Sequence, residues 1–146
     1  MHRSRPRGFT LLELAAVLGI IGLLSTIATP VLIIAVRRAH SAEARALVEA
    51  IADAELAYWR DHGKYLACPP SPDRMPVATP SSWTGGPEWK QLGFRAAGPV
   101  HYEYRVDLEA DSFKVVAVGD LDGNTKTAKF SLDGKTLELT VTDELE

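Results

Sequence analysis

The chain has 146 residues, a formal net charge of −3 and 46% hydrophobic residues. This length suits one small domain, and the negative charge argues against a general nucleic-acid-binding protein. The single cysteine, Cys68, excludes an intrachain disulfide and a zinc site built from several cysteines. The histidines do not have the local spacing of metal ligands, so a zinc enzyme is not expected. They are His2, His40, His62 and His101.

The chain begins with a basic leader and continues as an apolar segment. Residues 1–8 hold three arginines and no acid, and the 23 residues from Leu14 to Val36 carry no charge. About 20 apolar residues are enough to cross a bilayer as a helix. A secretory signal peptide is one alternative, but its apolar region usually has only about 7–15 residues. A plain signal anchor is another. It leaves Glu13 unexplained, because a charge inside hydrocarbon costs about 2.5–3.5 kcal/mol.

Residues 37–62 show the period of an amphipathic helix. Charged residues, Glu55 among them, are assigned to the faces outside its apolar stripe. Because residues 31–62 contain no glycine and no proline, we expect the apolar helix to continue directly into this one. Gly63 is placed to end it. The predicted stripe consists of Leu47, Val48, Ile51, Ala54 and Tyr58.

The C-terminal half is predicted to be a long loop followed by a sheet. Seven of the nine prolines lie between Pro69 and Pro99, which indicates an irregular connection. Its aromatic residues, Trp83 and Trp89 among them, are expected to pack this loop against the sheet. Four segments of alternating polarity follow, and Asp133-Gly134 is a typical hairpin turn between the last two.

Together these segments predict an α+β fold. A long N-terminal helix, membrane-spanning in its first half and amphipathic in its second, packs on a roughly four-stranded antiparallel sheet. The predicted organisation is a basic leader at 1–8, a transmembrane or assembly half-helix at 9–36, an amphipathic half-helix at 37–62, a Pro-rich αβ loop at 63–99 and an antiparallel sheet at 100–146.

The start of the chain resembles a class III signal. The run Arg7-Gly8-Phe9-Thr10-Leu11-Leu12-Glu13, followed by an apolar stretch that contains Pro30, is similar to the signal of the type IV pilin family, which the pseudopilins of type II secretion share. The resemblance covers residues 1 to about 36, and it implies the pilin fold. For the remaining residues the resemblance is one of architecture alone.

The resemblance implies that the chain is processed. Prepilin peptidase would cut between Gly8 and Phe9 on the cytoplasmic side of the membrane, and Phe9 would then be N-methylated. Cleavage removes three arginines, which leaves 138 residues with a formal charge of −6.

Glu13 and Pro30 are the two residues of the apolar segment with implied roles in assembly. In the family, the carboxylate at the Glu13 position pairs with the free amine of the neighbouring subunit, here that of Phe9. A buried carboxylate needs such a partner, because breaking a buried ion pair is costly. Pro30 removes one helix hydrogen bond, so it kinks or opens the helix. The resemblance implies local melting in the fibre, whereas membrane helices also tolerate proline without a role.

The function implied is that of a non-enzymatic structural subunit, a major or minor pilin of a type IV pilus. Before assembly the chain would be held in the lipid of the bacterial inner membrane. An inner-membrane assembly platform and motor would then add it to a homo- or hetero-polymer of pilins on the cell surface. The alternatives are a pseudopilin of a type II secretion system and a minor tip pilin that acts as a binding module. Nucleic acid is not an expected partner of so acidic a mature chain.

One pattern in the sheet region indicates a possible cofactor, calcium. Asp120, Asp122 and Asn124 alternate as oxygen ligands do at the start of a calcium loop. Thr125 and Ser131 stand where an EF-hand needs glycine and glutamate, so a full EF-hand is rejected. The alternatives are a calcium site that also uses backbone carbonyls and a tight polar turn, which these residue types favour by themselves. Cys68 is expected to be a free thiol.

Overall fold

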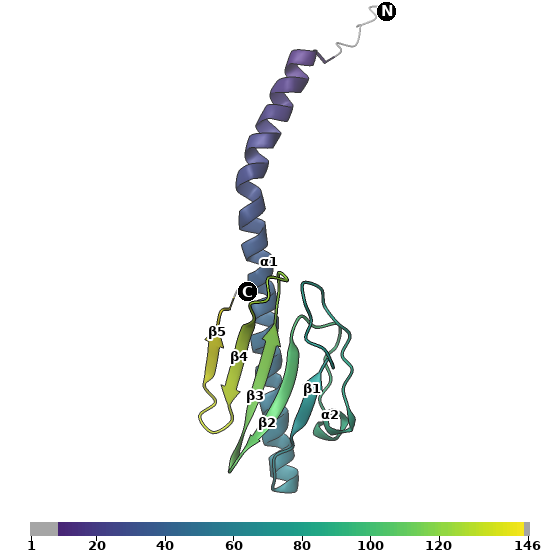
Figure 1. Ribbon diagram of the computed structural model, residues 1–146, viewed down its shortest axis with the longest axis vertical. Coiled ribbons are helices and arrows are strands. Elements are labelled where there is room, and N and C mark those ends of the chain that lie inside the picture. Colours follow the sequence, from purple (N-terminus) through teal and green to yellow (C-terminus); the bar gives the residue numbers. More distant parts are fainter. Residues whose placement is uncertain (1–8, 145–146) are drawn as a thin grey trace, which may run out of the picture. The chain divides into compact units, whose positions relative to one another are not determined.

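The computed structural model describes residues 9–144, in which a long helix is followed by a five-stranded antiparallel sheet (Figure 1). The strands are hydrogen-bonded in the order β1-β2-β3-β4-β5. This confirms the predicted α+β fold, with one strand more than expected. The elements are α1 (Leu11–His62), β1 (Cys68–Ser71), α2 (Pro87–Leu92), β2 (Glu103–Glu109), β3 (Ser112–Gly119), β4 (Ala128–Asp133) and β5 (Leu139–Thr142).

The chain divides into two compact units, the first ending at Val36 and the second beginning at Arg37. The described part of the first unit is almost entirely the apolar first half of α1. Among the described residues, α1 is the one helix long and apolar enough to cross a membrane, and none of its apolar window is buried. Its hydroxyl groups are satisfied internally, since Ser25, Thr26 and Thr29 donate hydrogen bonds to carbonyl oxygens of the preceding turn.

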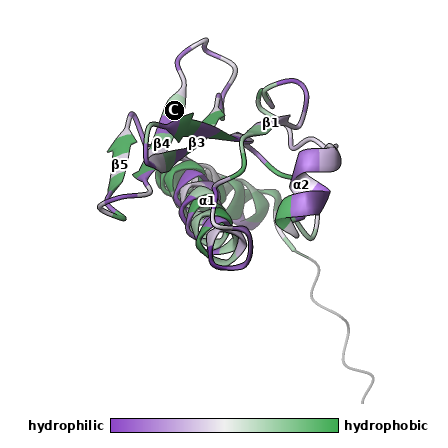
Figure 2. Cartoon of the chain, turned by 90° about the horizontal axis from the view of Figure 1, so that it is seen from below, coloured by the Kyte–Doolittle hydropathy of each residue, from purple (hydrophilic) through white to green (hydrophobic). Residues whose placement is uncertain are grey.

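In the second unit, the rest of α1 packs on one face of the sheet (Figure 2). The buried stripe differs from the prediction, because Leu47 and Ala54 are only partly buried and Glu55 is fully buried. The sequence pattern counted only apolar side chains, whereas the packed face also takes a serine and a glutamate. The buried residues, mostly three or four positions apart, are Ser41, Ala44, Val48, Ile51, Ala52, Glu55 and Tyr58.

The sheet contributes its alternating side chains to the same core. Tyr102 precedes β2, and Tyr104 and Val106 within the strand point inward with it, whereas Leu108 is half exposed. Phe113 and Phe130 from β3 and β4 are fully buried beside them, and the ring of Phe130 meets that of Tyr102 edge-on. The core therefore lies between the second half of α1 and the inner face of β1–β4.

The Pro-rich segment after α1 is more regular than a loop. It contributes the edge strand β1 and the short helix α2. Prolines are tolerated in β1 because an edge strand leaves one row of backbone amides unused. Pro87 stands in the first turn of α2, and Gly93 ends it in the left-handed conformation. As predicted, the aromatic residues pack inward, with Trp83 edge-on to Trp89.

Polar contacts hold the start of the second unit's helix to three other parts of the chain. Arg37 forms an ion pair with Asp122 at 2.8 Å, and Glu43 accepts hydrogen bonds from His101. Near the C-terminus, the carboxylate of Glu144 lies 2.6 Å from the Ser41 hydroxyl and 2.9 Å from the Arg45 guanidinium. We call Arg37, Ser41, Glu43 and Arg45 the polar collar of α1.

Two turns depend on glycine for different reasons. Gly63, just past the end of α1, has a φ of +69° and donates its amide to the Trp59 carbonyl, as predicted for a helix stop. Gly134 follows β4, where a Cβ would lie 2.6 Å from the Phe113 ring and 2.7 Å from its carbonyl oxygen. The Asp133-Gly134 hairpin is longer than the predicted two-residue turn, because β5 begins only at Leu139.

Glu55 is a carboxyl group inside the apolar core. One of its oxygens accepts the backbone amide of Leu66 at 3.0 Å, and the other has no hydrogen-bond partner. Burial raises the pKa of this carboxyl to about 7. The folded protein therefore holds a proton that the unfolded chain has already released above its ordinary pKa.

We expect the free energy of unfolding to fall as the pH rises from about 4.5 to 7, because ionised Glu55 is tolerated in the unfolded chain but not in the core. The loss is roughly 3 kcal/mol, since one pKa unit corresponds to about 1.4 kcal/mol. Urea unfolding of the full chain in detergent at pH 5 and pH 8, followed by tryptophan fluorescence, measures it. Glu55→Gln should remove most of the pH dependence, and Glu49→Gln, at an exposed position of the same helix, should not.

We expect Gly134→Ala to lower the free energy of unfolding by about 1–3 kcal/mol, because the new methyl group must displace the Phe113 ring or the β3 backbone. Thermal unfolding of the full chain in detergent provides the measurement. Gly98→Ala is the matched control, because a Cβ there meets nothing within 4 Å. Equal melting temperatures for the two variants would contradict the close packing of Phe113 on Gly134.

Candidate processing and assembly segment

The first turn of α1 is closed by a reciprocal pair of side chains, Thr10 and Glu13. The Glu13 carboxylate accepts hydrogen bonds from both the backbone amide and the hydroxyl of Thr10, each at 2.9 Å. In return, the Thr10 hydroxyl oxygen accepts the backbone amide of Glu13 at 3.2 Å. This is a capping box, which satisfies helix amides that otherwise lack partners.

The capping box gives Glu13 a second role that the sequence-based prediction missed. A threonine followed three residues later by glutamate is its signature, and it was present in the sequence. The arrangement keeps the carboxylate at the helix start, where the partial positive charge of the helix also favours it. Glutamine can close the same box, so capping requires the side-chain oxygen but not the charge.

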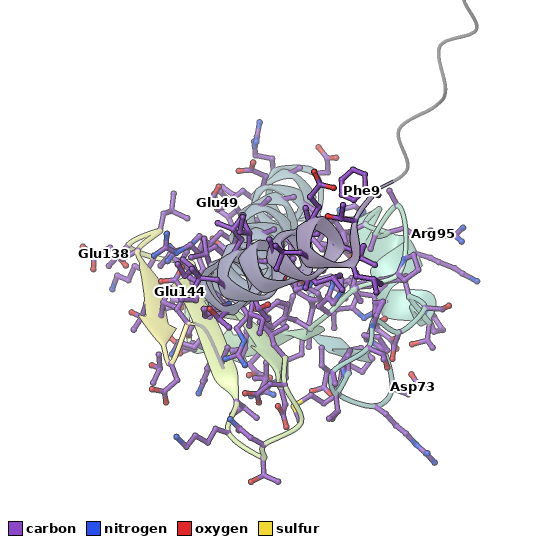
Figure 3. The ribbon with its side chains drawn as sticks, turned by 90° about the horizontal axis from the view of Figure 1, so that it is seen from above. Phe9, Glu49, Asp73, Arg95, Glu138 and Glu144 are labelled. Carbon is purple, nitrogen blue, oxygen red and sulfur yellow. The ribbon has the colours of Figure 1, made fainter. Side chains whose placement is uncertain are left out.

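Around this carboxylate the surface is apolar. Phe9 is 76% exposed, and its ring projects from the chain just before α1 (Figure 3). Together with Phe9, fifteen large apolar side chains between Leu11 and Val36 are exposed. A surface of this kind marks contact with lipid or with another protein. Gly8, the other residue of the predicted cleavage site, lies outside the described residues. The structure therefore locates only the Phe9 side of that site.

Pro30 lies within α1, which is helical on both sides of it in the single chain. The described structure therefore tolerates the proline, and the melting implied for the fibre stays a prediction. The hydroxyl of Thr29, just before it, bonds back to the Ser25 carbonyl at 2.8 Å. The hydroxyl groups of Ser25, Thr26 and Thr29 thus lie within about one turn before the proline, in the apolar half of α1.

The predicted calcium residues lie together in the loop between β3 and β4. Burial opposes ionisation of Asp120, but hydrogen bonds from backbone amides, including those of Gly123 and Thr125, hold its pKa below its usual range. Asp122 accepts the Asn124 amide and pairs with Arg37. Hydrogen bonds of this kind are those expected of a tight polar turn, which the sequence offered as the alternative to a calcium site. Calcium binding by Asp120, Asp122 and Asn124 stays a prediction.

Cys68 is a free thiol within β1, as expected, and is 2% exposed. Burial, with Glu55 and Glu88 nearby, raises its pKa to about 12. A thiol of this kind is a poor nucleophile, because the thiolate is the reactive form.

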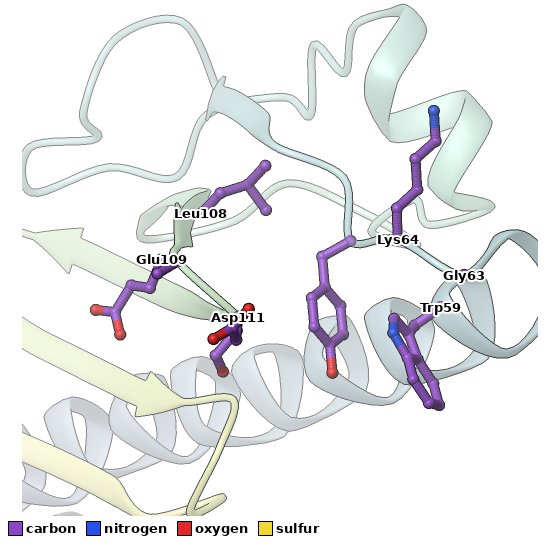
Figure 4. A pocket seen from close by; sticks show the side chains of 9 residues that line it. Trp59, Gly63, Lys64, Leu108, Glu109 and Asp111 are labelled. Atoms are coloured by element: carbon purple, nitrogen blue, oxygen red, sulfur yellow. The ribbon is translucent and has the colours of Figure 1, made fainter.

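A cavity of about 480 Å³ opens between the end of α1 and the β2–β3 turn (Figure 4). Trp59 and Lys64 line one side of it, and Glu109 and Asp111 line the other. Ser112 also reaches it, but the described lining contains no histidine that could activate a serine. The cavity therefore offers a mixed polar surface and no nucleophile–base pair.

Comparison with known proteins identifies the N-terminal segment. Residues 3–29 match the family model described as the prokaryotic N-terminal methylation motif. The matched residues include residues 3–8 of the predicted leader, Phe9, Glu13 and most of the apolar half of α1. No curated protein and no solved structure matches the chain significantly. The motif is a class III signal consistent with the type IV pilin family, and it supports a pilin-like or pseudopilin precursor.

Proposed function

We propose that this chain is a prepilin, a structural subunit of a type IV pilus that joins a helical filament after its leader is removed. The observation that carries the proposal is the methylation motif at residues 3–29 together with the exposed apolar half-helix it begins. The second unit supports it, because a small α+β domain after such a helix is the pilin architecture. In this proposal the protein is structural and not an enzyme.

The proposed pathway starts in the inner membrane. The apolar half of α1 spans the bilayer, prepilin peptidase cuts between Gly8 and Phe9, and Phe9 is methylated. An assembly platform and motor then move the subunit from the membrane into a polymer of pilins. A motor is needed because lipid and a helix bundle both cover the apolar surface of the helix, so packing alone does not drive its extraction from lipid. A contact between unlike faces of neighbouring subunits, repeated without closing, gives a helical filament.

Glu13 would guide each subunit into register. Its carboxylate is held at the start of α1 by Thr10, in a setting of exposed apolar side chains. Cleavage creates a positive amine on Phe9, and such an amine on a neighbouring subunit is the natural partner of a carboxylate inside an apolar bundle. This ion pair would select one axial offset between neighbouring helices, because their apolar surfaces alone do not favour any particular offset.

The N-terminus of the protein tests the function directly. Mass spectrometry of the sheared cell-surface fraction should find peptides that begin at Phe9 and carry one added methyl group. The same processed terminus confined to the envelope would point to a minor pilin or to a pseudopilin of type II secretion. An intact Met1 leader would contradict the prepilin proposal.

Glu13→Gln separates the charge of this side chain from its capping role. Glutamine can still accept the Thr10 amide, so the helix start should persist, but the ion pair would be lost at a cost of about 3–5 kcal/mol per contact. We expect filaments in the sheared fraction to fall by at least about 10-fold, with the processed protein in the membrane unchanged. Immunoblots of the two fractions measure both quantities.

Two further variants complete this test. Glu138→Gln changes an exposed glutamate and should leave assembly intact. Thr10→Ala removes the cap and keeps the Glu13 charge, so its effect on filaments should be smaller than that of Glu13→Gln. Normal filament yield from Glu13→Gln would show that the carboxylate charge has no part in assembly.

A further inference from the structure

A cluster of three potential metal ligands lies beside the polar collar. His40 and Glu43 stand one turn apart on α1, and His101 lies just before β2, so the fold joins residues that are about 60 positions apart. One ligand atom from each residue lies within 4.8 Å of the other two. The imidazole rings of His40 and His101 are 3.7 Å apart between centroids, at an interplanar angle of 30°.

Glu43 fixes the position of His101. One carboxylate oxygen accepts the backbone amide of His101 at 3.0 Å, and the other lies 2.8 Å from its Nδ1. In the imidazole tautomer protonated at Nε2, the Nδ1 lone pair faces this carboxylate oxygen, so the two atoms can bind one ion together.

The nitrogens of His40 are available as ligands. Within residues 9–144, neither ring nitrogen of His40 has a hydrogen-bond partner, and its ring contact is with His101. The side chains of His101 and Glu43 are 20% and 26% exposed, which leaves a path for an ion and for water.

We propose that His40, Glu43 and His101 bind one divalent transition-metal ion of the zinc class. Two imidazoles and a carboxylate form a known three-ligand set for Zn²⁺, with water in the remaining position. In a tetrahedral site with bonds of about 2.0–2.1 Å, ligand atoms are roughly 3.3 Å apart. Binding an ion would therefore require rotations of these partly exposed side chains, whose ligand atoms lie within 4.8 Å of one another without it.

The proposed ion would join α1 to the segment before β2. Nitrogen ligands favour zinc, nickel and copper over calcium and magnesium, so this site is distinct in chemistry as well as position from the Asp120 loop. Coordination of the ion would cross-link α1 to the segment before β2, beside the contacts of the polar collar. The expected consequence is a stabilised second unit, since a ligand that binds only the folded state raises its stability.

The test is a titration of the full chain, without an affinity tag, with Zn²⁺ alone in detergent. We expect one ion per chain by calorimetry and a higher melting temperature with Zn²⁺. His40→Asn, His101→Asn and Glu43→Gln should each weaken binding by at least about 10–100-fold, since even a change in a residue that only supports a ligand has an effect of this size. His62→Asn is the matched control, because His62 stacks on Tyr58 and lies outside the cluster.

The proposal is overturned if no stoichiometric Zn²⁺ binding occurs, or if His40→Asn and His101→Asn bind the ion as tightly as the original chain. Circular dichroism without metal verifies that the variants fold. Should a variant unfold, NMR of the original chain decides. Zn²⁺ must then shift the ring resonances of His40 and His101 and leave those of His62 in place, and shifts at His62 alone would also overturn the site.

Discussion

The exposed apolar surface of the first half of α1 is the constraint on which the rest of this protein depends. Sixteen large apolar side chains between Phe9 and Val36 are in contact with solvent in the single chain. Burying each of them fully is worth about 1.5–3 kcal/mol, so the whole surface represents tens of kcal/mol. The second unit has its own filled core and does not need this surface. The first half of the helix must therefore be covered by lipid or by another protein chain.

A surface that is apolar on all sides gives strong association but little specificity, and in the proposed filament Glu13 supplies the specificity. In the single chain the capping box holds its carboxylate against the Thr10 amide and hydroxyl. These contacts satisfy hydrogen-bonding groups without neutralising the charge. The charge stays in need of a cation wherever water is excluded. The same residue therefore caps the helix in the single chain and, in the proposed filament, requires a cationic partner.

Much of the fold could be predicted from local pattern. The stop at Gly63 and the alternating residues of β2, β3 and β4 follow from rules that act over a few positions. The strand β1 was missed because Pro69 and Pro70 argue against a strand in general, and only its place at the sheet edge makes them acceptable. The predicted stripe of α1 was slightly misplaced, because the burial of Glu55 depends on the Leu66 amide beyond the helix end.

The functional residues likewise fall into those that local sequence pattern reveals and those that only the tertiary structure brings together. Most of the predicted leader, Phe9 and Glu13 belong to one continuous signal, so they could be recognised in the sequence, and the methylation motif matches them. His40 and His101 could not be paired in this way, because the spacing rule for metal ligands is local and the fold brings them together from α1 and the start of the sheet. The tertiary structure alone also pairs Arg37 with Asp122 and Ser41 with Glu144.

The polar collar explains how one helix serves two different environments. From Ala44 to Tyr58 the helix is held by apolar contacts with the sheet. From Arg37 to Arg45 the contacts become charged, and they reach the β3–β4 loop, the segment before β2 and the C-terminal residues. Charged contacts tolerate water and lipid headgroups. Apolar side chains at these positions would instead extend the exposed apolar surface of α1 into the folded domain. The collar thus ends the apolar surface of the helix where the folded domain begins, which in the proposed filament confines the apolar assembly contacts to the half of the helix that carries Glu13.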